Sequence, residues 1–599
     1  MILATLFALA VTVGATSAPT YRVDLTRYFA SPAAEAAQRP TLMAELDRFI
    51  ADSTHPLATP AALLALLRAD DRLRREIRLH ELYEHLRAAA DTEDHAAAAA
   101  DVALGFAEDR LDAARAHAIR QAGQPALDRF LAIEPALAPW RHLVESDVQV
   151  RAAAVANEHA VAVLAQPALE SLAKAYGDLR RAALVAGHSA SAPADAAAAF
   201  HAKWTPWQTN GPAFAALLVP IATIQDGQAR LQGYTDAAEA AYASQGLTSP
   251  QVHAVLAAVR VSPAWANYTT LVASATARRL GVPPDRVTPW QMEGDGSWHP
   301  QPVALSEALE RILAAEREVG PAYADQFERL LDPASARVDW CRGPSCDDVG
   351  FSVGAPGATS ALFYGAYDGG IDSVRAVAHE AAHAVHRQLM SEHQPIAAYQ
   401  SGPKFIFESF AIFNELLVLD HLQRSATTRE DQRGLLRWFI DDAIRQVFGS
   451  ARETALEEAL HADVQAGRAR TAADLDARTL AVFADYTPPQ QRSEDSRAFW
   501  SRNRLYFIDP FYDTNYLFAG LLALAWLRQF EQDPRDFERR YVALLENGFD
   551  APPQAILQRF MHIDLADGAG LVRDANATIV ARTAALARLY EAPEVMPAP

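Results

Sequence analysis

Two histidines four residues apart, with a glutamate directly after the first, form the group of side chains best suited to chemistry in this chain. They stand in the segment VAHEAAHAVHRQL, residues 377–389. Residues four apart on a helix lie on one face with Cβ atoms about 5–6 Å apart, so His379 and His383 can present ring nitrogens to one metal ion. Glu380 is rotated off that line, where it can reach a metal-bound water but not the metal. The pattern therefore predicts two zinc ligands and a general base for hydrolysis.

The sequence around this group predicts the helix that must hold it. Residues 371–389 contain neither proline nor glycine, and apolar side chains recur at helical spacing. Asp372 or Ser373 can cap the first turn. The apolar face is formed by Val374, Val377, Ala378, Ala381 and Val385.

A third ligand is expected from the apolar segment KFIFESFAIFNELLVLDHL, residues 404–422. It carries Glu408 and Glu415, which are seven residues apart and so lie on nearly the same helical face. The surrounding apolar side chains predict that this face is buried, and a buried carboxylate is costly unless it is paired, hydrogen-bonded or bound to metal. We interpret Glu408 as a zinc ligand and Glu415 as a candidate hydrogen-bond partner of a ligand histidine. In the alternative interpretation, both glutamates face a polar seam between helices.

The segments HEAAHAVH and FESFAIFNELL together resemble the zinc oligopeptidases of the thimet oligopeptidase and oligoendopeptidase F family, closer to the oligoendopeptidase F side. That family has H-E-x-G-H-x-x-H, then a glutamate ligand about 25 residues after the second histidine, then Asn-Glu six and seven positions further on. Here Glu408 stands at that distance from His383, and Asn414 and Glu415 have the expected offsets. The resemblance implies one zinc ion per chain and oligopeptide substrates.

A tyrosine-rich segment near the C-terminus extends the resemblance. YFIDPFYDTNYLFAG, residues 506–520, resembles the family's P-F-Y-Y-x-x-Y segment, in which a tyrosine hydroxyl stabilises the tetrahedral oxyanion. Tyr516 matches the last tyrosine, and the resemblance implies that role for it. Without the resemblance, Tyr512 and Tyr516 would be interpreted as core aromatic residues at helical spacing.

Several positions depart from the family pattern. Ala382 replaces the glycine before the second ligand, Asp513 replaces the middle tyrosine, and Leu505 replaces a histidine, with Tyr506 as its only polar substitute nearby. These changes leave the predicted zinc ligands intact. They affect the residues expected to stabilise the oxyanion, and therefore the expected rate or substrate. His386 matches an additional family histidine, and we interpret it as structural or as a partner of the ligands, not as a ligand.

The rest of the chain predicts a mainly α fold. Amphipathic helical patterns fill residues 34–185, a small polar stretch follows at 186–200, and helical patterns resume. Residues 337–370 are rich in glycine with short β-prone pieces, which predicts a small β insert directly before the zinc-binding helix. The resemblance adds a two-lobed body with a deep substrate channel and an edge strand that pairs with the substrate backbone. The expected divisions are a signal peptide (1–18), an N-terminal helical lobe (19–200), a catalytic region (201–586) and a tail (587–599).

Composition restricts the partners and the compartment. The net charge of −20 over 599 residues argues against a general nucleic-acid binder, and no segment after the N-terminus is long and apolar enough to span a membrane. The N-terminal run MILATLFALAVTVGATSAP resembles a secretory signal peptide, although it lacks a basic residue. A disulfide between Cys341 and Cys346, the only cysteines, would agree with export. We therefore expect a periplasmic or secreted bacterial protein, or a cytoplasmic one if the run is not a working signal.

These observations predict a zinc-dependent metalloendopeptidase that cuts internal bonds of short, unfolded peptides. The sequence shows no G-x-S-x-G elbow, phosphate-binding loop or dinucleotide fingerprint that would support other chemistry. One alternative is a metallocarboxypeptidase or dipeptidase of a related helical zinc fold. The other is a degenerate zinc-containing peptide-binding protein with little turnover, suggested by Leu505 and Asp513. No sequence feature sets the oligomeric state.

Overall fold

A computed structural model describes residues 21–149, 165–188, 195–293, 300–365 and 367–591, together with residues 154, 157, 161 and 298. The described chain is mainly helical with one small sheet, which confirms the predicted fold class. The predicted signal peptide, residues 1–18, lies outside the described residues, as do residues 592–599 of the predicted tail. No helix of the described ranges is both long and apolar enough to cross a membrane.

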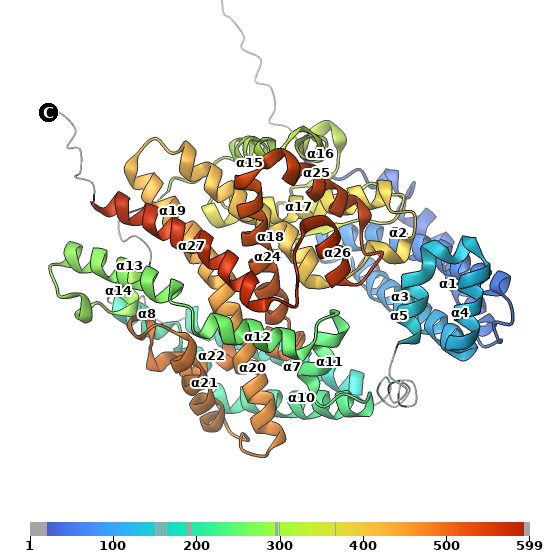
Figure 1. Cartoon of the computed structure of the whole chain (residues 1–599), viewed down its shortest axis with the longest axis horizontal. Coiled ribbons are helices and arrows are strands. Elements are labelled where there is room, and N and C mark those ends of the chain that lie inside the picture. The colour runs from blue at the N-terminus through green and yellow to red at the C-terminus, as the bar shows by residue number, and fades with distance from the viewer. Residues whose placement is uncertain are drawn as a thin grey trace, which may run out of the picture.

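The first five helices form one end of the molecule, coloured blue to cyan in Figure 1. Proline opens α1 and α2 at the position where its missing N–H costs nothing, and the preceding Ser31 and Thr59 hydroxyls accept backbone N–H groups. The helices are α1 (Pro32–Asp52), α2 (Pro60–Ala90), α3 (His95–Ala122), α4 (Gln124–Ile133) and α5 (Arg141–Val148).

A second group of helices packs with helices that come much later in the chain. The aromatic rings of Tyr176 and Phe507 stack at 3.9 Å in a core that also contains Phe214 and Trp500. The predicted lobe boundary at residue 200 stays a prediction. α7 precedes this residue but packs against helices that follow it. The early helices of this group are α7 (Gln166–His188), α8 (Ala196–Ala202), α9 (Thr205–Thr209), α10 (Gly211–Leu231), α11 (Ala237–Ser244), α12 (Ser249–Arg260), α13 (Ala264–Leu280) and α14 (Pro289–Met292). The late ones are α20 (Ser450–Gln465), α21 (Ala472–Tyr486), α22 (Phe499–Arg502) and α23 (Leu505–Ile508).

The β insert forms a three-stranded sheet directly before the motif helix, as predicted. Its strands are β1 (Val338–Asp339), β2 (Gly350–Val353) and β3 (Ala361–Tyr364), in the order β1-β3-β2. β3 is central and buried, pairing in parallel with β1 and antiparallel with β2. β2 is therefore an edge strand with one free row of backbone groups.

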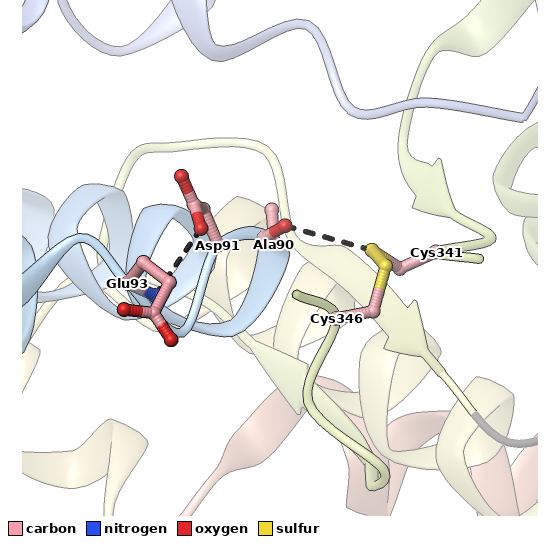
Figure 2. The surroundings of a disulfide bond; sticks show 5 residues. All are labelled: Ala90, Asp91, Glu93, Cys341 and Cys346. Atoms are coloured by element: carbon pink, nitrogen blue, oxygen red, sulfur yellow. Dashed lines mark hydrogen bonds between the residues drawn. A yellow bond between two sulfur atoms is a disulfide. The ribbon is translucent and has the colours of Figure 1, made fainter. Parts of the chain in front are cut away.

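The two cysteines form a disulfide that closes a small loop between β1 and β2, as expected. Figure 2 shows the bond beside Ala90 at the end of α2. Two backbone hydrogen bonds hold the loop there, from Asp347 N–H to the Ala89 carbonyl (2.9 Å) and from Thr92 N–H to the Ser345 carbonyl (2.7 Å). The loop thus fixes the sheet to the N-terminal helices.

Three long helices form the centre of the molecule. They are α17 (Ile371–His393), α18 (Lys404–Ser425) and α24 (Asp513–Gln532). The predicted cap of α17 is wrong, because the helix begins at Ile371 after Gly370 and no side chain caps it. The Ser373 hydroxyl instead donates to Asp368 Oδ1 at 2.7 Å, which fixes the turn before the helix.

The remaining helices surround these three. Burial explains their apolar faces, since they pack into the largest apolar core of the molecule. They are α15 (Leu305–Val319), α16 (Pro321–Leu331), α19 (Arg429–Ile444), α25 (Pro534–Asn547), α26 (Pro553–Met561) and α27 (Gly568–Glu591).

Candidate metal centre

The two helices α17 and α18 bring His379, His383 and Glu408 together, as the sequence predicted. Glu408 Oε2 lies 3.5 Å from His379 Nε2 and 3.9 Å from His383 Nε2. One ligand atom of each residue lies within 4.8 Å of the other two. A tetrahedral zinc ion bound at about 2.0–2.1 Å holds its ligand atoms about 3.3 Å apart. The two glutamate–histidine distances are thus within about 0.6 Å of those in a zinc site, and all three donor atoms could reach one ion by moving closer together.

The unsatisfied polar atoms of this group support the same fit. Glu408 Oε2 is buried and has no hydrogen-bond partner among the described residues. A buried carboxylate oxygen without a partner is costly, and a metal ion removes that cost. Burial holds the pKa of His383 well below its usual value, so this ring is neutral and its nitrogen can bind a metal.

Glu415 orients the first histidine, which was one of the two interpretations that the sequence allowed. Its Oε1 lies 2.5 Å from His379 Nδ1, so the ring directs Nε2 towards the other two ligands. The Arg375 guanidinium pairs with the second oxygen of Glu415. Although burial opposes the shift, Arg375 and His379 lower the pKa of Glu415 to about 2. The neighbouring Asn414 has a different role from Glu415. Its side-chain amide donates to the Tyr323 hydroxyl at 2.9 Å and not to one of the candidate ligands.

Glu380 has the position expected of a general base beside the metal. Its Oε1 lies 4.0 Å from His379 Nε2, and its side chain is 18% exposed. Burial raises the pKa of this carboxyl, which increases its basicity when it is ionised. β2 passes close above it, because a Cβ at Gly350 would lie 3.4 Å from Glu380 Cγ and 2.7 Å from the Tyr364 ring.

The tyrosine segment brings Tyr512 into contact with a candidate ligand, which the sequence analysis did not predict. The Tyr512 hydroxyl donates to Glu408 Oε1 at 2.8 Å. The ring of Tyr516, the tyrosine selected from the sequence, lies 5.1 Å from that of Tyr512 between centroids. Burial and the charge of Glu408 raise the pKa of both tyrosines, so both hydroxyls stay proton donors at neutral pH. The four-residue spacing of Tyr512 and Tyr516 was the available signal, and without the family resemblance it indicates only core packing.

The structure shows the contacts of Tyr506 and Asp513, two of the residues noted where the segment departs from the family pattern. The Tyr506 hydroxyl donates to the Glu453 carbonyl at 2.7 Å, so it does not replace the missing histidine. Asp513 is buried and accepts from Asn503 Nδ2 at 2.7 Å. Phe511 has a positive φ of 63°, unusual for a residue with a side chain. Its N–H donates to Glu457 Oε2 at 2.8 Å, and this contact holds the strained turn in place.

The third histidine of the motif helix is structural. His386 is fully buried, and its ring lies 4.3 Å from that of Phe410 and 4.8 Å from that of Phe407. Burial and the charge of Arg387 hold its pKa well below the usual value. The ring therefore packs as a neutral aromatic group, and it is absent from the metal-ligating group.

The proteins that this chain resembles are peptidases, which agrees with the geometry of the candidate centre. A sequence profile of peptidase family M3 matches residues 369–571, which contain every residue of the centre. The fold is similar to that of a putative peptidase from Chlamydophila abortus, with a TM-score of 0.78 at 18% identity over 96% of this chain and 98% of that one. It is also similar to oligoendopeptidase-F from Enterococcus faecium, with a TM-score of 0.61 at 16% identity over 93% and 99%.

A third similar structure is a putative oligoendopeptidase F from Bacillus anthracis. Its TM-score is 0.67 at 13% identity, over 91% of this chain and 96% of that one. No curated protein sequence matched the chain. At these identities the structural likeness establishes the fold, and the sequence profile matches the motif-bearing region alone.

Proposed function

We propose that the protein is a zinc-dependent metalloendopeptidase acting on short, unfolded oligopeptides, since a sequence profile of peptidase family M3 matches residues 369–571. The observation that carries the proposal is the convergence of His379 Nε2, His383 Nε2 and Glu408 Oε2, with the last oxygen buried and lacking any other partner among the described residues. These three side chains would hold the metal. A bound zinc ion supplies Lewis acidity, which polarises the scissile carbonyl and acidifies the attacking water.

The protein's own residues would move the protons. The Glu380 carboxylate takes a proton from the attacking water as the water oxygen bonds to the carbonyl carbon. It then delivers that proton to the peptide nitrogen as the carbon–nitrogen bond breaks, so the carboxylate is regenerated. A hydroxyl of Tyr512 or Tyr516 would donate to the negative oxygen that forms; the contact of Tyr512 with Glu408 and the packing of Tyr516 against Tyr512 support this role.

The edge strand β2 supports a peptide substrate of varied sequence. Its free backbone groups can pair with an extended peptide without contacting any side chain. The disulfide Cys341–Cys346 supports the further proposal that the protein works outside the cytoplasm.

The test is a panel of internally quenched peptides of graded length, with and without a zinc chelator. Glu380→Gln should lower kcat by at least about 1,000-fold while bound zinc stays near one per chain by elemental analysis. Glu392→Gln makes the same chemical change on the same helix and should leave turnover within about twofold, because its Oε1 accepts from Gln388 far from the ligands. Cleavage that persists after complete zinc removal would refute the proposal.

Blocking the peptide C-terminus separates the proposal from an exopeptidase. An endopeptidase cleaves the blocked peptide, whereas a metallocarboxypeptidase or dipeptidase does not. A degenerate binding protein would bind zinc and peptide with turnover no greater than that of Glu380→Gln.

A further inference from the structure

Arg387 lies on the same face of α17 as the two ligand histidines. It follows His383 by four residues, as His383 follows His379, and this spacing repeats on one helical face. Its guanidinium carbon lies 5.5 Å from the centre of the Phe407 ring, and its Nε donates to Ser352 Oγ at 3.3 Å. The cation is therefore held between β2 and α18, next to the metal centre.

Nothing in the described residues neutralises this cation. Among the described residues, Arg387 forms no ion pair with a carboxylate, and its Nε donates to the Ser352 hydroxyl instead. Burial lowers the pKa of its guanidinium. Glu380 and Glu81 are the carboxyl groups that raise its pKa, and Arg78 lowers it. Burial and the neighbouring Glu108 raise the pKa of Glu81 to about 7, so this carboxyl carries little charge below neutral pH.

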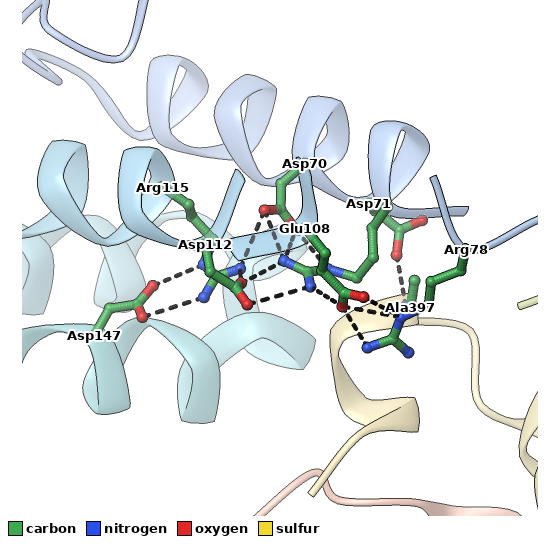
Figure 3. A network of polar contacts seen from close by, with 9 residues as sticks. Asp70, Asp71, Arg78, Glu108, Asp112, Arg115, Asp147 and Ala397 are labelled. Atoms are coloured by element: carbon green, nitrogen blue, oxygen red, sulfur yellow. Dashed lines mark hydrogen bonds and ion pairs between the residues drawn. The ribbon is translucent and has the colours of Figure 1, made fainter. Parts of the chain in front are cut away.

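The paired arginines close by make the contrast clear. In Figure 3, Arg78 pairs with Glu108, and Arg115 pairs with Asp112 and Asp147. Arg387 is partly buried, and a cation withdrawn from water normally has such a partner, because an unpaired charge there is expensive. The missing partner of Arg387 therefore points to an anionic group supplied by a ligand.

The edge strand gives the direction of a bound peptide, and the rise of α17 gives the distance between this anion and the cleaved bond. β2 passes over Glu380 at Gly350 and reaches Arg387 at Gly354, where a Cβ would lie 2.9 Å from Arg387 Cβ. A peptide extended along β2 thus runs from the metal centre towards Arg387. His383 and Arg387 are about 6 Å apart along the helix axis, which is about two residues of an extended peptide.

A cavity provides space for the substrate beyond Arg387. It has a volume of about 660 Å³ and lies between the N-terminal helices and the catalytic helices, with Arg78, Gly402 and Phe549 in its lining. The rings of Phe549 and Phe407 lie 5.0 Å apart, so the cavity wall continues to the ring that supports Arg387.

We propose that Arg387 binds a carboxylate of the substrate, carried about two residues from the cleaved bond. The carboxylate is either an Asp or Glu side chain or the free C-terminus of the peptide. This inference rests on the proposed peptidase function and names a class of substrates for it.

The experiment uses two matched peptide pairs with the wild-type protein, Arg387→Gln and Arg387→Lys. In the first comparison, two peptides differ only by Glu or Gln at one position, and this position is varied over the first four on either side of the cleaved bond. In the second comparison, two peptides differ only by a free or an amidated C-terminus. We expect wild-type kcat/KM to fall at least about tenfold when the carboxylate about two residues away becomes an amide, mainly through KM. Arg387→Gln should abolish this preference and keep cleavage of neutral peptides within about threefold, and Arg387→Lys should keep part of the preference.

Arg424→Gln is the matched control, because Arg424 is half-exposed at the far end of α18 and pairs with Asp420 and Glu318. It should leave the preference unchanged. All assays use one ionic strength, because the net charge of −20 repels anionic peptides. The inference fails if the wild-type protein shows no preference for the carboxylate, or if Arg387→Gln slows acidic and neutral peptides equally, which would indicate a structural role.

Binding measurements separate this inference from the proposed function. Fluorescence anisotropy with Glu380→Gln reports affinity for each labelled peptide without any hydrolysis. If the wild-type protein cleaves nothing, the proposed function fails. The proposed role of Arg387 is then still supported if the carboxylate peptide binds at least about tenfold more tightly than its amide and Arg387→Gln removes the difference. The role is refuted if the two peptides bind equally.

Discussion

At the scale of single residues, the metal centre depends on the partners of its ligands as much as on the ligands. Glu415 fixes His379 through Nδ1, and Tyr512 occupies one oxygen of Glu408 so that the other faces the histidines. His383 has no such partner, since its Nδ1 is buried without a hydrogen bond among the described residues. The orientation of this ring therefore comes from packing, and a bound metal would fix it further.

The two tyrosines should have separable roles. Tyr512→Phe removes the donor to Glu408 Oε1, so zinc affinity should fall about 10–100-fold. Tyr516→Phe should lower kcat about 100–1,000-fold at unchanged zinc affinity, if its hydroxyl is the donor to the oxyanion. Chelator competition gives the affinity, and steady-state kinetics at saturating zinc give kcat. The opposite pattern, with a kcat loss in Tyr512→Phe alone, would assign the oxyanion to Tyr512.

The convergence of the three candidate ligands was predictable from the sequence, whereas their surroundings were only partly so. Helical periodicity fixes how His379, His383 and Glu380 lie relative to one another, and burial of an apolar helix explains why Glu408 needs a metal. The position of Tyr512 depends on a strained turn at Phe511, which Glu457 holds from another helix. The missing partner of Arg387 is also a tertiary property. No local pattern records such contacts.

At the scale of elements, α2 joins the N-terminal helices to the sheet and to the edge of the substrate cavity. Its C-terminal end carries the disulfide loop, and Arg74 and Arg78 line the cavity. The periodic pattern predicted this helix well because it is long and amphipathic. The cap of α17 was mispredicted because Ser373 bonds to Asp368 instead, a choice made by the preceding loop.

Glu81 on α2 should make stability depend on pH. Burial and Glu108 raise its pKa to about 7, above the usual value near 4.5. The folded protein therefore keeps a proton that the unfolded chain loses, and the free energy of unfolding should decrease as pH rises from about 4.5 to about 7. Because Glu81 is partly exposed, we expect a loss of only about 1–2 kcal/mol.

Glu81→Gln should remove this dependence, because glutamine resembles the protonated acid. Chemical denaturation at pH 5 and pH 8 should show the variant equal to the wild-type protein at the first and about 1–2 kcal/mol more stable at the second. Glu76→Gln on the same helix is the control, since Glu76 is half-exposed and pairs weakly with Arg72. Identical pH dependence in Glu81→Gln and the wild-type protein would contradict the assignment.

At the scale of the whole molecule, three distant parts of the chain meet at Tyr399, just before the helix that carries Glu408. The Tyr399 hydroxyl accepts from Leu143 N–H at 3.1 Å and donates to the Pro139 carbonyl at 3.0 Å. Its backbone carbonyl accepts from Phe549 N–H at 2.9 Å. The N-terminal helices and the C-terminal region are thus attached to the same short helix, η6 (Ala397–Gln400). These contacts also form one end of the cavity next to Arg387.

Tyr399→Phe should loosen the N-terminal helices without disturbing the metal centre. The change leaves the Leu143 N–H and the Pro139 carbonyl without this partner, at a cost of about 1–3 kcal/mol. Hydrogen exchange should therefore become faster in residues 135–148, while zinc affinity and cleavage of neutral peptides stay within about twofold. Tyr367→Phe is the matched control, because that hydroxyl donates to the Val303 carbonyl at 2.8 Å and touches none of these helices. Unchanged exchange in residues 135–148 would mean that the apolar contacts alone hold the N-terminal helices against the catalytic region.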